Sequence, residues 1–169
     1  MDDTTKELLT EGLTNYGTAL RAIKTFEGEL GSACERAIEA ALEEMELPIS
    51  GSSDHKRELS WQPWVQAWTP FNLEDDRWTV WAGVKWNLAA GNAPFLVSSI
   101  YGTPKHVPKA ALKLRDGRES LSRRISRTDW ACPLDPKEPF EERLSSFVRE
   151  VVEFHIEAAG ADADPAASK

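Results

Sequence analysis

The chain has 169 residues, a formal net charge of -8 and a hydrophobic fraction of 41%, which fit one domain with a packed core and exclude a disordered chain. No apolar run approaches the roughly 18 residues of a membrane-spanning helix, and the acidic start Met1-Asp2-Asp3 is unlike a secretory signal. We therefore expect no membrane contact and a cytoplasmic location.

Charge is distributed unevenly, and one basic segment lies between acidic ones. Residues 1–50 carry 4 basic and 11 acidic groups, a net charge of -7. Residues 105–134 carry 8 basic and 3 acidic groups, net +5, and residues 135–169 carry 4 basic and 9 acidic groups, net -5. The pattern predicts separate acidic and basic regions on the surface.

The first 45 residues have the pattern of a long amphipathic helix, Thr4–Met45. Apolar residues follow one another at alternating spacings of four and three: Leu9, Leu13, Tyr16, Leu20 and Ile23. Gly28 and Gly31 interrupt the pattern, so we expect a kink or a second helix start near Ser32. We expect this stripe to pack on a sheet, with pairing of two such helices in a dimer as the alternative; Glu27 at a seam position disfavours a long coiled coil.

Six of the seven tryptophans lie between Trp61 and Trp86, where side chains alternate with a period of two. This spacing predicts a β-hairpin. One face of its second strand carries Trp78, Val80, Ala82, Val84 and Trp86, and the other carries Arg77, Thr79, Trp81, Gly83, Lys85 and Asn87. Pro70, Asn72 and the acidic run 74–76 supply the turn, and Pro63 places the first strand at a sheet edge or bulge.

The remaining elements are predicted from local composition and from the glycines and prolines that separate them. We expect a polar loop over 49–58, a third strand over 95–101, a short helix from Pro108 to Leu114 and a fourth strand within 125–132. A last helix over 138–159 buries Phe140, Leu144, Phe147, Val148, Val151 and Ile156 and stops at Gly160. Residues 1–160 then form one domain, and residues 161–169 form a disordered tail.

These elements define an α+β fold: an antiparallel sheet of three or four strands with an N-terminal and a C-terminal helix packed on it. The order of elements is similar to that of small acidic dimeric chaperones of bacterial secretion systems. The likeness is confined to element order, without a shared motif, and no family is assigned from it.

The first candidate site is the polar face of the hairpin, where Gln62, Trp64, Gln66 and Trp68 meet Thr79, Trp81 and Lys85. Aromatic surface beside amide and ammonium donors binds a base, a sugar or a peptide. The competing interpretation is that a helix covers this face and the tryptophans belong to the core.

The second candidate is the basic segment 105–127, whose cations can neutralise phosphates or meet an acidic protein surface. An acidic chain without a zinc-finger, RNP or phosphate-loop pattern favours a protein partner over nucleic acid. Together the two candidates give the predicted binding residues: Trp64, Trp68, Trp81, Lys85, Lys105, Lys109, Lys113, Arg115, Arg123, Arg124 and Arg127.

Catalytic chemistry finds little support in the sequence. Glu74, Asp75, Asp76 and Lys85 resemble the acids and lysine of nucleases with the restriction-endonuclease fold, but Gly83 stands where that pattern requires an acid. The three histidines are isolated from one another, and Cys34 and Cys132 read as two buried free thiols. We expect no catalytic residues, no metal and no cofactor.

The leading hypothesis is a non-enzymatic, adaptor-like or chaperone-like module that binds a protein or peptide partner and forms a homodimer. A ligand-binding or nucleic-acid-binding domain that uses the tryptophan face and the Lys/Arg segment is the alternative. A divergent metal-dependent nuclease is the third hypothesis.

Overall fold

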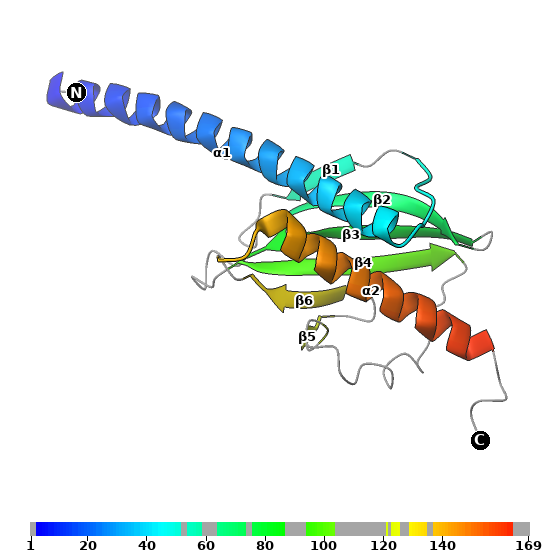
Figure 1. The fold of residues 1–169 in the computed structure, drawn as a ribbon. Helices are drawn as coiled ribbons and strands as arrows, with labels where there is room; N and C mark the ends of the chain where they lie inside the picture. The colour runs from blue at the N-terminus through cyan, green and yellow to red at the C-terminus, as the bar shows by residue number, and fades with distance from the viewer. Residues whose placement is uncertain are drawn as a thin grey trace. The chain divides into compact units, whose positions relative to one another are not determined.

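A computed structural model of the chain contains two helices and one antiparallel sheet (Figure 1). It describes residues 3–51, 54–58, 64–73, 76–86, 94–103, 121, 123–125, 129–134 and 137–163. The chain divides into two units, Met1–Leu30 and Gly31–Lys169. Helix α1 (Asp3–Glu44) begins in the first unit and ends in the second, and every other element belongs to the second unit.

The sheet of the second unit has six strands in the order β1-β2-β3-β4-β6-β5, and each neighbouring pair is antiparallel. Three long central strands, β2 (Trp64–Leu73), β3 (Asp76–Lys85) and β4 (Phe95–Thr103), follow one another along the chain. Shorter strands flank them: β1 (Asp54–Glu58), β5 (Arg123–Arg124) and β6 (Asp129–Pro133).

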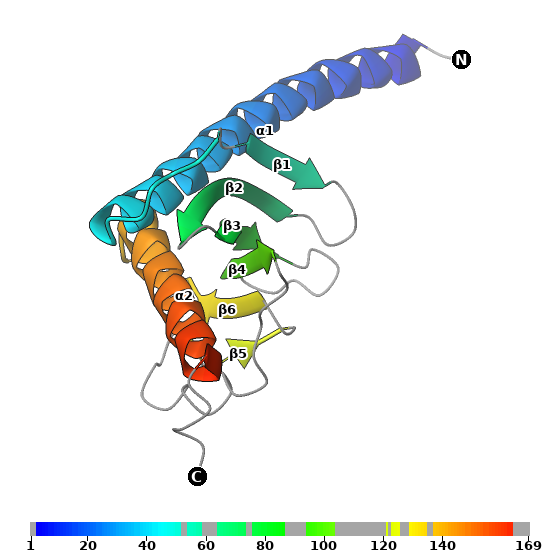
Figure 2. The same cartoon turned by 90° about the vertical axis from the view of Figure 1, so that its right-hand side faces the viewer.

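Helix α2 (Phe140–Ala163) packs across β3 and β4 and covers one face of the sheet, as Figure 2 shows. Alternate residues of β2, β3, β4 and β6 point into this contact and are buried, among them Val65, Phe71, Trp78, Val80, Leu96, Ile100 and Trp130. We call this the helix face of the sheet. Trp130 donates a hydrogen bond from Nε1 to Nε2 of His155 at 3.2 Å, so the imidazole accepts at that nitrogen and its proton lies on Nδ1.

The C-terminal end of α1 joins this layer through ion pairs with α2. The guanidinium of Arg36 donates two hydrogen bonds to the Glu141 carboxylate, at 2.6 and 3.0 Å, and Arg149 pairs with Glu44. The hydrogen bond from Arg36 lowers the pKa of Glu141. Between these pairs, the small side chains Ala37 and Ala41 are buried with Cys34 and Ile38, which allows the helix to approach its neighbours closely.

The predicted fold class is confirmed: the chain is α+β, with helices packed against an antiparallel sheet. Each of the four predicted strands corresponds to an observed one, β2, β3, β4 and β6. Within the described residues, no helix is long and apolar enough to cross a membrane. The expected helix from Pro108 to Leu114 and the tail beyond Ala163 lie outside the described residues.

The predicted loop over 49–58 is wrong, because its second half forms β1, an additional edge strand paired with β2. The residues Asp54–Glu58 are all polar, and charged residues are tolerated on an edge strand that faces solvent on its outer side. Consequently β2 is an inner strand, and Pro70 lies within it rather than in a turn. Pro70 lies outside the β1–β2 ladder, which stops at the pair Asp54 and Trp68, so its missing N–H removes no bond to β1. Its carbonyl accepts a hydrogen bond from the Ser50 amide at 2.9 Å.

The helix predictions need three corrections. Helix α1 runs through Gly28, Gly31 and Ser32 without a second start, and α2 continues past Gly160 to Ala163. A glycine in a helix costs only about 1 kcal/mol relative to alanine, and the alanines and glutamates on either side are strong helix formers, so the helix continues through the glycines. The buried stripe of α2 includes Val152, Phe154, His155 and Ala158, whereas Phe140 and Ile156 are half-buried.

The expectation that the N-terminal stripe packs on the sheet stays a prediction, because the stripe belongs to the first unit and the sheet to the second. Seven large apolar side chains between Leu8 and Phe26 are exposed, among them the whole series Leu9, Leu13, Tyr16, Leu20 and Ile23. Within the first unit itself, a single helix, these side chains have no second element to pack against.

Both cysteines are free and buried, as predicted. Burial and, to a smaller extent, the nearby Glu141 carboxylate raise the pKa of the Cys34 thiol to about 12. Burial also raises the pKa of Cys132, against the opposing effect of Arg143, whose Nη2 donates to the sulfur at 2.8 Å.

The raised pKa of Cys34 predicts a loss of stability in alkaline solution. The thiol titrates near 9.0 when unfolded and at about 12 when folded, so its contribution is present below pH 9 and is lost as the pH rises toward 12. The slope reaches about 1.4 kcal/mol per pH unit. Urea unfolding of wild type and Cys34→Ala across this range should show a steeper decline for wild type; parallel profiles would contradict the assignment.

Candidate functional site

The sheet face opposite α2 carries the candidate site, and we call it the open face. No helix of the described residues of the second unit lies on it. Residues on this face alternate with the buried residues of the helix face, and the antiparallel register aligns them in rows across the strands. One row runs Trp68, Trp81, Ser99 and Asp129; the next runs Gln66, Gly83, Val97, Ala131 and Arg123; a third runs Trp64, Lys85, Phe95 and Pro133.

Aromatic side chains supply much of the surface of the open face. Trp64, Trp68 and Trp81 are half-buried. Trp81 stacks on Tyr101 of β4, with 5.3 Å between ring centroids and 21° between ring planes. On a neighbouring row the Arg123 guanidinium lies 5.1 Å above the centroid of the Phe95 ring, a cation–π contact. The face therefore offers flat apolar area in fixed orientations.

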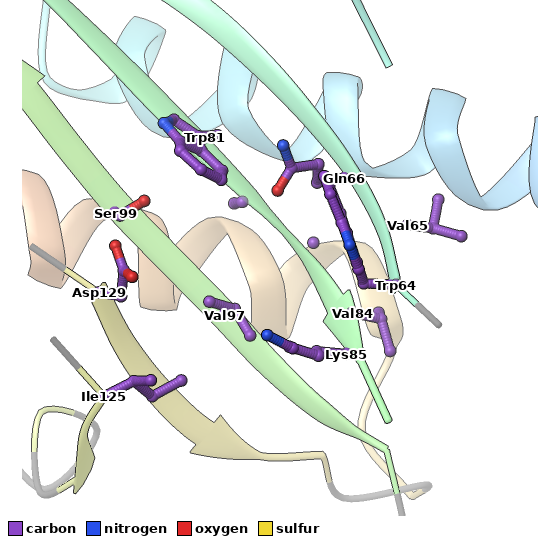
Figure 3. Close-up of a pocket in the computed structure, with 12 residues that line it drawn as sticks. Trp64, Val65, Gln66, Trp81, Val84, Lys85, Val97, Ser99, Ile125 and Asp129 are labelled. Carbon is purple, nitrogen blue, oxygen red and sulfur yellow. The ribbon is translucent and has the colours of Figure 1, made fainter. Parts of the chain in front are cut away.

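A cavity of about 260 Å³ is hollowed into the open face between β2, β3, β4 and β6 (Figure 3). Trp64 and Trp81 form walls, and Ile125 stands at the side of β5 (Figure 3). Gly83 and Val97 occupy the row between the rows of the two tryptophans. This volume is at the small end for a ligand site and matches one large side chain or a compact small molecule.

Four polar side chains surround the cavity: Gln66, Lys85, Ser99 and Asp129 (Figure 3). Asp129 accepts a hydrogen bond at 3.4 Å from the hydroxyl of Tyr101, which links the carboxylate to the stacked pair. No carboxylate of the described residues pairs with the Lys85 ammonium. The cavity thus combines aromatic area with an ammonium that is available to a ligand.

Glycine is required at position 83, where β3 pairs closely with β2. A Cβ atom at this position would lie 2.1 Å from the carbonyl oxygen of Val65 and 2.6 Å from Cα of Gln66, both backbone atoms. Any side chain would push the two strands apart. The absence of a side chain also leaves room between Trp64 and Trp81, so the same residue permits both the strand pairing and the cavity.

The structure brings together four of the predicted site residues, Trp64, Trp68, Trp81 and Lys85, on one face, with three of them lining the cavity. The interpretation that a helix covers this face is not supported by the described residues. Arg123 lies on the same face, and Arg124 lies in β5. The other cations predicted for the site lie outside the described residues: Lys105, Lys109, Lys113, Arg115 and Arg127.

Sequence reasoning missed Val97, Ser99, Ile125 and Asp129, which come from other strands than the hairpin. The alternation of apolar and small residues in β4 shows which of its residues share a face. The register between β4 and β6, which sets Asp129 opposite Ser99, has no local signal because the two strands are separated by the long 104–128 connection.

Of the residues in the nuclease hypothesis, only Asp76 and Lys85 lie among the described ones. Asp76 and Lys85 stand at opposite ends of β3, about 30 Å apart along an extended strand. Glu74 and Asp75 lie outside the described residues. Among the residues that are described, no group of three or more histidine, cysteine or acidic side chains can hold a metal ion.

Comparison of the chain with models of protein families, with curated proteins and with solved structures found no match. We therefore infer a function from the residues of the open face.

The close approach at Gly83 predicts the cost of a single methyl group. Gly83→Ala should lower the free energy of unfolding by at least about 2 kcal/mol, because the backbone of β2 cannot yield without breaking the sheet. Urea unfolding measures the change. Gly28→Ala is the matched control, since a Cβ there meets nothing within 4 Å, and it should leave stability unchanged or raise it by up to about 1 kcal/mol.

Proposed function

We propose that this protein is a non-enzymatic interaction module that binds a peptide segment of a partner protein on the open face. The observation that carries the proposal is the cavity in which Trp64, Trp81 and Lys85 come together on the face away from α2. A side chain of the partner seats in this cavity, and the flanking peptide lies over the rows of residues on either side.

The aromatic walls favour an apolar or aromatic side chain in the cavity. Tryptophan supplies large rigid contact area at low cost in conformational entropy, and interface hot spots are enriched in it. Trp81 is already held in place by Tyr101, so little ordering is needed on binding. The polar groups of Gln66 and Ser99 match the N–H and C=O groups of a peptide backbone.

The charge on the open face favours an acidic residue next to that side chain. On β3, β5 and β6 its charged side chains are three cations, Arg77, Lys85 and Arg123, and the carboxylate of Asp129, whereas the whole chain carries a net charge of -8. The register of β1 places Asp54, Lys56 and Glu58 in the same rows, at the far side of β2 from Lys85. Lys85 lies in the cavity wall without a carboxylate partner among the described residues. The preferred ligand therefore has an apolar side chain beside a carboxylate.

We place this module in the cytoplasm. The support is chemical: two buried free thiols fit a reducing compartment.

The proposal is tested by selecting peptides from a random library displayed on phage and measuring synthetic copies by calorimetry. Selected sequences should share a large apolar residue next to Asp or Glu. Trp81→Ala should weaken binding about thirtyfold, the loss typical of a buried aromatic anchor, and excess chelator should leave binding unchanged. Lys85→Ala should weaken the binding of acidic peptides. Lys137→Ala is the matched control and should leave their binding unchanged, because that lysine is exposed and lies just before α2.

The proposal fails if no peptide is enriched above background, or if enriched peptides bind wild type and Trp81→Ala equally. Urea unfolding of each variant shows whether the fold is intact, so a loss of binding by unfolding is distinguishable from a loss of contact.

Nucleic-acid binding remains the alternative prediction. It depends on the Lys/Arg segment, most of which lies outside the described residues. Strong dependence of a gel shift on salt, with single-stranded nucleic acid as the probe, would support it over peptide binding.

A further inference from the structure

The first unit presents a continuous apolar stripe on an otherwise polar helix. Leu9, Leu13, Tyr16, Leu20 and Ile23 are between 39% and 71% exposed, although their spacing is that of a packing surface. The stripe recurs every 3.5 residues on average, which is the coiled-coil repeat rather than the 3.6 of a straight helix.

The spacing assigns heptad positions. Position a holds Lys6, Leu13, Leu20 and Glu27, and position d holds Leu9, Tyr16, Ile23 and Leu30. The next a and d residues in the same register, Cys34, Ala37 and Ala41, are buried within the second unit. One heptad pattern thus serves as a packing surface in the second unit and is exposed in the first.

We propose that residues 6–30 of α1 pair with the same residues of a second copy of this chain as an antiparallel coiled coil. Antiparallel pairing sets each a position against a d position of the other copy. The register that uses the whole stripe sets Leu13 against Ile23 and Tyr16 against Leu20 at the centre, each twice by symmetry. The outer layers pair Leu9 with Glu27 and Lys6 with Leu30.

Charge at the two polar core positions determines the direction. In a parallel pair, Lys6 would meet Lys6 and Glu27 would meet Glu27, and like charges in adjacent core positions repel. In the antiparallel pair, Lys6 of one copy and Glu27 of the other occupy neighbouring layers. Each lies at an end of the stripe near water, so the two opposite charges attract without complete desolvation.

The residues that flank the stripe fit the same register. At the flanking g positions, antiparallel pairing sets Phe26 beside Gly12 of the second copy. Phe26 is exposed, and there is open space around Gly12, where a Cβ would meet nothing within 4 Å. At the dyad, Gly17 meets Gly17 on one side and Ala19 meets Ala19 on the other, so small residues allow close approach at the centre.

The extent of the contact is sufficient for a specific dimer of moderate affinity. Eight core layers with their flanking residues bury roughly 1,000 Å² in total, which is the lower bound for a specific interface. We therefore expect a dimer that dissociates on dilution rather than an obligate one.

The experiment is sedimentation equilibrium of the full chain over a range of concentrations. Wild type should form a reversible dimer. Leu13→Glu introduces a charge into a central layer and should raise the dissociation constant at least about a hundredfold. Leu8→Glu is the matched control: the same residue type, similarly exposed, but at the outward c position, and it should leave the dissociation constant unchanged.

A charge swap tests the direction of pairing independently of helix stability. Lys6→Glu and Glu27→Lys should each weaken the dimer about tenfold, and the double variant should restore it. A parallel dimer would show no rescue, because each position then meets its own copy. Circular dichroism of each variant checks that the helix content is retained.

The proposal is overturned if wild type is a monomer throughout, if Leu8→Glu dissociates the dimer as strongly as Leu13→Glu, or if the double charge swap fails to restore association. The contact uses none of the open-face residues. Failure of peptide binding and failure of dimerisation are therefore separate results.

Discussion

Burial of one sheet face under α2 determines what the other face can do. Strands β2, β3 and β4 alternate large side chains between two directions, and the helix takes up only one of them. Trp78 and Trp130 are buried in that contact, and a hydrogen bond to His155 also holds Trp130 in place. Trp64, Trp68 and Trp81 lie on the other face, which no described helix of the second unit covers, and Trp64 and Trp81 form walls of the cavity there.

The sequence predicts those parts of the fold that depend on neighbours within one element. The period of two along β3 correctly separates Trp78 from Trp81, and the same rule puts Lys85 on the open face. The sequence does not predict edge strand β1, because its residues are all polar and show no alternation of apolar side chains. It forms by pairing with β2, and its own sequence does not show that pairing. Ser99 and Asp129 meet only through the register of strands that are distant in sequence, so no local pattern predicts that part of the site.

Helix α1 shows the limit of amphipathic spacing as a guide. The pattern identifies a surface that packs, but it does not identify what it packs against. From Cys34 onward the partner is the chain's own α2 layer, where ion pairs to Glu141 and Arg149 hold the contact. Before Gly31 the described residues supply no partner. Gly28 and Gly31, which were expected to break the helix, do not do so. An isolated glycine lowers helix stability by only about 1 kcal/mol, which is not enough to interrupt the backbone hydrogen bonds on either side.

The division of tryptophans between two environments has a practical consequence. Trp78 and Trp130 are shielded from solvent and should fluoresce at short wavelength, whereas Trp64, Trp68 and Trp81 are partly accessible to a soluble quencher such as acrylamide. The protein thus contains two intrinsic optical probes. One population reports on the integrity of the core, and the other reports on occupancy of the opposite surface, without any attached dye.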